Sequence, residues 1–190
     1  MKVTDDQYAF SEDSALLGDC IRELQGRAFL EIGMGNGVNL QRYAHNFELA
    51  VGTDLQSLAV MKRIRSDAFE LVVTDRAICF RQEAFDVVVF NPPYMPSDTL
   101  EDIAVDGGRM GVEVPLSFLR EALRVSKPNS IILMLLSTHS DLHAFQEYCS
   151  ENSLTYKIVA EKKLFFETLL VYDIRSDQES KPRFQTNHGE

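Results

Sequence analysis

Short apolar runs alternate with amphipathic segments along most of this chain. Apolar runs rich in β-branched residues predict buried strands, and apolar positions three or four residues apart predict helices. The longest apolar run, IILMLL at residues 131–136, fits a strand in the core. The pattern predicts strands at residues 28–32, 49–53, 69–73, 85–90, 131–136, 155–160 and 164–172, and helices at residues 14–24, 38–46, 56–67, 114–125 and 141–151.

This alternating order predicts an α/β fold. Strands separated by helices form a parallel sheet that helices cover on both faces. The last two predicted strands are close together in sequence, so we expect them to form an antiparallel pair. Sheets of this kind bind ligands beyond the carboxyl ends of their strands. The residues that follow each strand, including the irregular stretch 91–111, are therefore the first candidates for chemistry.

Length and composition fit one globular domain. The 190 residues are 45% hydrophobic and 25% charged, which suits one core and is short for two. We expect a single domain at residues 1–175, whose first 27 residues form an N-terminal segment and helix. The polar residues 176–190 are expected to form a flexible tail.

The sequence favours a reduced, cytoplasmic protein. No apolar run approaches the roughly 18 residues that a membrane span needs, and the N-terminus lacks the basic-then-apolar order of a signal peptide. Cys20, Cys79 and Cys149 are scattered and form no CxxC pair, so neither a disulfide framework nor a zinc site is indicated.

The charge balance argues against nucleic acid as a partner. The formal net charge is −10, and phosphates are repelled by an acidic protein unless a local basic patch compensates. The densest basic stretch, KRIR at residues 62–65, is interpreted as a solvated helix face.

A glycine-rich run follows the first strand. Gly33, Gly35 and Gly37 have the spacing GxGxG, and Glu31 stands two positions before them. Glycines allow a tight turn and a close approach of the backbone to a ligand. A dinucleotide site would have glycine or alanine at position 38, where this chain has Val38. The acidic residue suits a cationic ligand such as S-adenosylmethionine better than a pyrophosphate. The alternative is a tight turn without a ligand.

Acidic residues also follow the second and third strands. Asp54, with Leu55 after it, lies about 20 residues beyond the glycines, where a carboxylate can accept hydrogen bonds from ribose hydroxyls. Asp75, followed by Arg76, could accept from an adenine amino group. Each aspartate could instead be a cap or turn residue. Because both fall at predicted strand ends, they favour a nucleoside cofactor, and we assign all four residues to its site.

The fourth strand ends in the sequence NPPY. The two prolines hold the backbone rigid, so the Pro92 carbonyl can point at a ligand. Together with the Asn91 side chain it can grip both hydrogens of a planar –NH₂ group. Tyr94 can fix the plane of that group with its ring or hydroxyl. Such a device would position a weakly nucleophilic nitrogen in line with a methyl group. The alternative is a proline-stiffened turn.

Taken together, these residues resemble the class I S-adenosylmethionine-dependent methyltransferases. Within that class the chain is similar to the glutamine N5-methyltransferases of peptide-chain release factors, in particular their short archaeal and eukaryotic branch. YAFSEDS at residues 8–14 matches a segment usually written Y-x-P-x-E-D-[ST], with Phe10 in place of proline. DGGRMG at residues 106–111 matches a glycine-rich loop, and EKKLFFE at residues 161–167 resembles a closing hairpin. The likeness extends to about Arg175.

The resemblance implies a Rossmann-like, seven-stranded, mostly parallel sheet of order 3-2-1-4-5-7-6 and the cofactor S-adenosyl-L-methionine. The substrate would be the glutamine of a Gly-Gly-Gln loop in a class I release factor. A small zinc-binding activator subunit would pair with the apolar edge strand at residues 70–73 to form a heterodimer. Catalysis would rest on Asn91, Pro92 and Tyr94, and cofactor binding on Ser14, Glu31, Gly33, Gly35, Gly37, Asp54, Leu55, Asp75, Arg76 and Asn91.

Three other functions stay open on the residues alone. The NPPY device would also serve a nucleic-acid base amine, adenine N6 or guanine N2, although the chain has no spare length for a recognition domain. A protein lysine would need deprotonation and a different pocket. A binding module without activity would be indicated by a damaged glycine loop or NPPY motif, and both are intact.

Two weaker patterns are interpreted structurally. His139 and His143 are four residues apart, but no third metal ligand is evident, and Ser140 or Asp141 would cap the helix that begins there. The stripe Leu116, Leu119 and Leu123 is interpreted as the core face of a helix.

Overall fold

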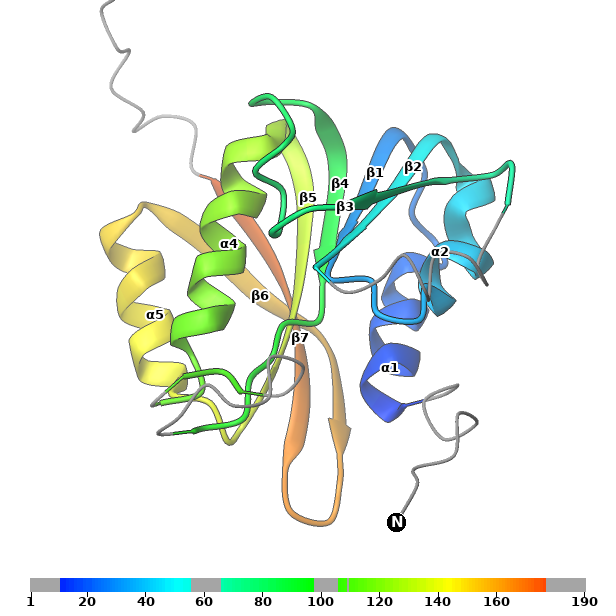
Figure 1. Cartoon of the computed structure of the whole chain (residues 1–190). Coiled ribbons are helices and arrows are strands. Elements are labelled where there is room, and N and C mark those ends of the chain that lie inside the picture. The colour runs from blue at the N-terminus through cyan, green and yellow to red at the C-terminus, as the bar shows by residue number, and fades with distance from the viewer. Residues whose placement is uncertain (1–10, 56–65, 98–105, 109, 177–190) are drawn as a thin grey trace, which may run out of the picture.

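A seven-stranded sheet of order β3-β2-β1-β4-β5-β7-β6 organises the molecule in the computed structural model (Figure 1). The structure describes residues 11–55, 66–97, 106–108 and 110–176. The predicted sheet order is confirmed. The strands are β1 (Gly26–Ile32), β2 (Phe47–Asp54), β3 (Glu70–Val73), β4 (Phe85–Phe90), β5 (Ser126–Ser137), β6 (Leu154–Lys163) and β7 (Thr168–Ser176), and the helices are α1 (Glu12–Ile21), α2 (Val38–Tyr43), the 3₁₀ turn η1 (Ala44–Asn46), α4 (Glu113–Val125) and α5 (Leu142–Glu151).

The first five strands are parallel and β7 is not. β1 pairs with β2 and β4, β2 with β3, and β4 with β5, all in parallel. β7 runs antiparallel to both β5 and β6. The carboxyl ends of the parallel strands therefore meet at one edge of the sheet, the lower edge in Figure 1. The amino end of α1 and the turn between β6 and β7 lie at the same edge (Figure 1).

Helices cover both faces of the sheet, as the alternating pattern predicted. Leu30 and Ile32 point to one face, where they belong to the core that α4 and α5 complete. Phe29, between them, belongs to the core on the other face, with Leu17 of α1 and Leu40 of α2. Successive side chains of a strand alternate between faces, so strands buried on both sides are apolar throughout. This is why β4 reads FDVVVF, in which only Asp86, partly exposed and paired with Lys127, is polar.

Most predicted elements match, and the differences have local causes. The bounds of β4 are as predicted, whereas β5 begins five residues earlier than the predicted 131–136 because Ser126 pairs with Phe85 before a register shift. Most of the predicted helix 56–67 and of the tail 176–190 lies outside the described residues, as do the basic residues 62–65.

The predicted last strand, at residues 164–172, is wrong by four residues. β7 begins at Thr168, and residues 164–167 form the turn that joins it to β6. The apolar run Leu164-Phe165-Phe166 had the composition of a strand, but Phe165 and Phe166 are almost fully exposed in that turn.

The helices α5 and α4 agree with two predictions. Asp141 caps α5 by accepting a hydrogen bond from Ala144 N at 3.0 Å, as predicted. In α4, Leu119 is fully buried and Leu116 and Leu123 pack against the core, also as predicted. Within the described part of the chain, no helix is both long and apolar enough to cross a membrane.

Candidate functional site

The glycine loop after β1 has a backbone that other residues would adopt only with strain. Gly33, Gly35 and Gly37 have φ angles of 69°, 54° and 67°, in the left-handed region that favours glycine. The Gly35 amide donates to the Asp54 carboxylate at 2.9 Å. A methyl group placed on Gly35 would meet no heavy atom of the described residues within 4 Å. The loop is thus held by the end of β2 and borders open space.

Glu31 is a buried carboxylate at the end of β1. Its Oε1 accepts from Asn39 Nδ2 at 3.2 Å, while its Oε2 is buried with no hydrogen-bond partner among the described residues. Burial raises the pKa of Glu31 from 4.5 to about 7, and hydrogen bonds from Asn39 and from the Leu40 backbone offset this only in part. A cationic group placed beside Oε2 would satisfy this oxygen and favour its charged form.

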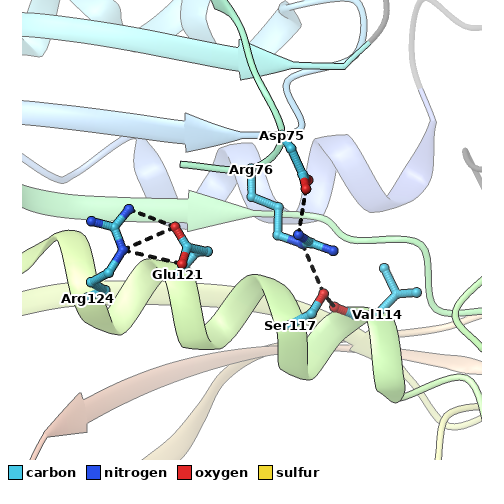
Figure 2. A network of polar contacts seen from close by, with 6 residues as sticks. All are labelled: Asp75, Arg76, Val114, Ser117, Glu121 and Arg124. Atoms are coloured by element: carbon cyan, nitrogen blue, oxygen red, sulfur yellow. Dashed lines mark hydrogen bonds and ion pairs between the residues drawn. The ribbon is translucent and has the colours of Figure 1, made fainter. Parts of the chain in front are cut away.

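Asp75 and Arg76 contact each other directly. Arg76 Nη1 lies 2.9 Å from Asp75 Oδ2, and Arg76 Nε donates to Ser117 Oγ at 3.0 Å. Figure 2 shows the guanidinium between these two partners, with Ser117 in turn donating to the Val114 carbonyl at 2.6 Å. The guanidinium carbon is 5.6 Å from the ring centroid of Phe118. The network joins the turn after β3 to α4.

Asn91 is held by α1. Its Nδ2 donates to Asp13 Oδ2 at 2.8 Å, across 78 residues of sequence. Since a carboxylate only accepts, this contact determines which way the amide faces. Asn91 Oδ1 is buried and, among the described residues, has no hydrogen-bond partner. The strand end therefore presents one oriented, unsatisfied acceptor.

Tyr94 stays protonated at neutral pH. Burial raises the pKa of its hydroxyl well above the usual value, and the negative charges of Asp13 and Glu167 raise it further. The side chain packs against both core clusters. Tyr94 is thus a fixed ring with a neutral hydroxyl, close to the partner of Asn91.

The loop at residues 106–111 packs on the backbone of the NPPY motif. Gly107 N donates to the Met95 carbonyl at 2.8 Å. A Cβ on Gly107 would lie 2.8 Å from the backbone of Tyr94, and one on Gly111 only 2.5 Å from the Tyr94 carbonyl oxygen. Only glycine fits these contacts without moving the motif.

The structure brings most of the predicted site residues to one edge of the sheet. Asn91, Pro92 and Tyr94 follow β4, and the glycines follow β1. Asp54 is the last residue of β2, and the exposed Leu55 comes directly after it. Ser14 lies in the first turn of α1, where its Oγ accepts from Ser11 Oγ at 3.0 Å.

Asp13 lies at the same edge, and the sequence alone assigns it no role. Asp13 belongs to the matched segment at residues 8–14, but only its contact with Asn91 reveals a role. Among the described residues, no three His, Cys, Asp or Glu side chains gather to hold a metal ion.

Comparisons with known proteins find methyltransferases. No family model matches the chain. A protein of Methanocaldococcus jannaschii, provisionally named a protein N5-glutamine methyltransferase, is 27% identical over 90% of this chain and 92% of its own length. The methyltransferase in the solved E. cuniculi Mtq2–Trm112 complex, described as responsible for methylating the translation termination factor eRF1, superposes with a TM-score of 0.75. It is 26% identical over 88% of this chain and 97% of that one.

The chain is similar in sequence and in fold to proteins named as protein N5-glutamine methyltransferases. A release factor glutamine methyltransferase of Caulobacter vibrioides is 30% identical over 55% of this chain, and the match spans 43% of that longer relative. The M. jannaschii and E. cuniculi relatives are matched over 92% and 97% of their own lengths, as expected from the resemblance to the short archaeal and eukaryotic branch.

Proposed function

We propose that this chain transfers a methyl group from S-adenosylmethionine to the side-chain amide of the glutamine in the Gly-Gly-Gln loop of a class I release factor, in the cytoplasm. The observation that carries the proposal is the state of Asn91. Its Nδ2 is engaged by Asp13, and its buried Oδ1 has no partner in the described part of the chain. A buried acceptor without a donor costs roughly 1–3 kcal/mol, and an N–H of the target amide would satisfy it.

The residues of the chain orient the target nitrogen. Asn91 Oδ1 would accept one amide hydrogen and the Pro92 carbonyl the other, which fixes the plane of the –NH₂ group. The Tyr94 ring would limit how that plane tilts. These acceptors also stabilise the positive charge that grows on the nitrogen as its lone pair forms the new bond. The raised pKa of Tyr94 keeps its hydroxyl protonated at neutral pH, so its phenolate does not take the displaced amide proton. We propose that this proton leaves to water.

The residues at the ends of β1 and β2 fit the cofactor. The unpartnered Glu31 Oε2 suits a cationic group, and the open space at Gly35 leaves room beside the loop. When bound, S-adenosylmethionine would supply an electrophilic methyl group whose bond to sulfur breaks with its electrons staying on sulfur. Ser14, Gly33, Gly37, Asp54, Leu55, Asp75, Arg76 and Asn91 are the further residues we assign to its site.

An activator subunit is part of the proposal. β3 is an edge strand of only four residues, and Val73 at its end is 49% exposed. Leu49, on the neighbouring β2, is 47% exposed. An exposed apolar strand edge favours pairing with another chain. The E. cuniculi relative was solved with a second subunit, and we propose that a small zinc-binding subunit covers β3 here.

A methyl-transfer assay with labelled S-adenosylmethionine tests this function. It compares a release factor carrying Gly-Gly-Gln, the same factor with that glutamine changed, and duplex DNA, each with and without the activator subunit. We expect label only in the intact factor. Asn91→Ala should abolish transfer while the cofactor dissociation constant stays within about twofold, because Asn91 acts chiefly on the target. Label in the altered factor or in DNA would mean that NPPY holds another amine.

A further inference from the structure

Two phenylalanines stand exposed at the tip of the β6–β7 hairpin. Phe165 is 91% exposed and Phe166 is 83% exposed. Their rings meet edge to face, with centroids 4.6 Å apart and planes 80° apart. Single apolar side chains are common on protein surfaces, but two adjacent aromatic rings at such exposure are typical of a surface that a partner covers.

The turn that carries these rings is tied down on both sides. Leu164 N donates to the Glu167 carbonyl at 2.8 Å and closes the turn. Ser137 Oγ donates to the Glu167 carboxylate, and Thr168 N donates to Thr138 Oγ1 at 3.0 Å. A turn fixed in this way presents its side chains in one place, which lowers the entropy that a partner must remove on binding.

Two further interactions place the tip of the hairpin at the rim of the site. Lys162 Nζ lies 3.5 Å from Glu12, the neighbour of the Asp13 that holds Asn91. Glu167, directly after the two rings, is close enough to Tyr94 for its charge to raise the pKa of that hydroxyl. In Figure 1 the hairpin projects beyond the lower edge of the sheet, where β4 ends.

A target glutamine that reaches Asn91 brings its own backbone to the rim of the site. The side-chain nitrogen of glutamine is about 5 Å from its Cα, from standard bond lengths. The substrate segment around the target glutamine must therefore lie within about that distance of the NPPY motif, where it contacts the residues that surround the site. Aromatic side chains are frequent among the residues that dominate such contacts.

We propose that Phe165 and Phe166 form a docking surface for the segment of the protein substrate that flanks the target glutamine. This inference rests on the function proposed above. An activator subunit on β3 is a less suitable occupant, because β3 and β6 are the opposite edges of the seven-stranded sheet.

Steady-state kinetics of the chain with its activator subunit tests the proposal. Phe165→Ala/Phe166→Ala should raise KM for the release factor about tenfold or more, since two aromatic contacts are lost. The kcat should stay within about twofold, and the cofactor dissociation constant should not change. Both side chains are exposed, so the variant should fold, and its melting temperature checks this. Ile158→Ala is the matched control, because Ile158 is 50% exposed on β6 of the same hairpin, and it should leave KM unchanged.

Each outcome separates this inference from the proposed function. If the wild-type enzyme labels the release factor and the double variant has an unchanged KM, docking at the tip is wrong and the function stands. Docking at the tip is also wrong, and the function stands, if the double variant has a lower kcat with an unchanged KM. The same conclusion follows if the variant no longer binds the activator subunit or no longer dimerises while its affinity for the substrate is unchanged. If the wild-type enzyme does not label the factor, the proposed function fails, and this inference fails with it.

Discussion

At the scale of single residues, the proposed function depends on two buried oxygens. Asn91 Oδ1 and Glu31 Oε2 have no hydrogen-bond partner in the described part of the chain. Both are oriented by a neighbour, Asp13 for Asn91 and Asn39 for Glu31. Thr53 Oγ1 and Ser126 Oγ are also buried without a partner among the described residues. Folded proteins rarely leave buried acceptors unpaired, and we propose that the substrate and the cofactor satisfy Asn91 Oδ1 and Glu31 Oε2.

Asp13 is expected to act as a positioning residue. Asp13→Ala removes the acceptor that orients the Asn91 amide, so the amide can rotate and present its –NH₂ to the target. We expect kcat/KM to fall about 100-fold, with little change in cofactor affinity. Asp13→Asn keeps an acceptor oxygen and should restore most of the rate. Kinetics and cofactor titration of both variants measure this. Equal damage by both changes, or a lost cofactor site, would contradict the positioning role.

Glu31 is expected to make the ligand-free protein less stable as pH rises. Its pKa is about 7 in the folded chain and near 4.5 otherwise. Between these values the folded state holds the extra proton, so the free energy of unfolding falls as pH rises through this window. The difference is on the order of 3 kcal/mol by linkage.

Denaturant unfolding from pH 4.5 to 8, compared with Glu31→Gln, isolates this contribution. The glutamine variant cannot ionise, so its stability relative to wild type should increase across the window and level off above pH 7. A constant difference between the two proteins would show that the Glu31 pKa is not raised.

At the scale of elements, loop contacts position the chemistry as much as strand ends do. Gly107 N reaches the Met95 carbonyl, and the glycine Cα lies so close to the Tyr94 backbone that a Cβ would sit 2.8 Å from it. Backbone cannot move aside as a flexible side chain can. The loop at residues 106–111 therefore determines where the NPPY motif lies.

Gly107→Ala should displace Tyr94 and lower methyl transfer. We expect kcat/KM to fall at least about tenfold and the protein to lose about 1–3 kcal/mol of stability, as in other overpacked sites. Gly26→Ala is the control, because its Cβ would find neighbours no nearer than 3.6 Å. Thermal unfolding and kinetics compare the two. Normal activity in Gly107→Ala would show that the loop yields without cost.

At the scale of the whole molecule, the two edges of the sheet have different expected roles. β3 at one edge is short, with Val73 exposed, whereas β6 at the other edge ends in the hairpin at the rim of the site. An activator on β3 and a substrate at the hairpin could therefore bind together.

Val73→Lys should weaken the activator complex about tenfold or more, because a lysine at a strand edge opposes pairing with another chain. Ile158→Lys places the same charge on the opposite edge strand and should leave the complex intact. Co-purification and titration with the subunit measure the difference. Equal loss in both variants would indicate a general charge effect, and no loss in either would move the interface away from Val73.

Much of this protein could be predicted from its sequence, since periodicity and strand-end motifs are local. The alternation of strands and helices indicated the parallel sheet, and GxGxG and NPPY fell at the strand ends that the fold brings together. These patterns can be recognised in the sequence because burial of an apolar face dictates the spacing of apolar residues over a few positions.

Only the tertiary structure decided which groups meet. The Asp13–Asn91 contact spans 78 residues, and no short-range pattern encodes it. The exposed turn at residues 164–167 was predicted as strand because Leu-Phe-Phe has strand composition, whereas Glu167, bonded to Ser137 of β5, helps to fix the turn there. Side-chain pairing depends on distances across the folded chain. The sequence therefore determined the sheet and the strand ends that carry the motifs. Three-dimensional packing decided how the Asn91 amide is oriented there and that Phe165 and Phe166 are exposed at the rim of the site.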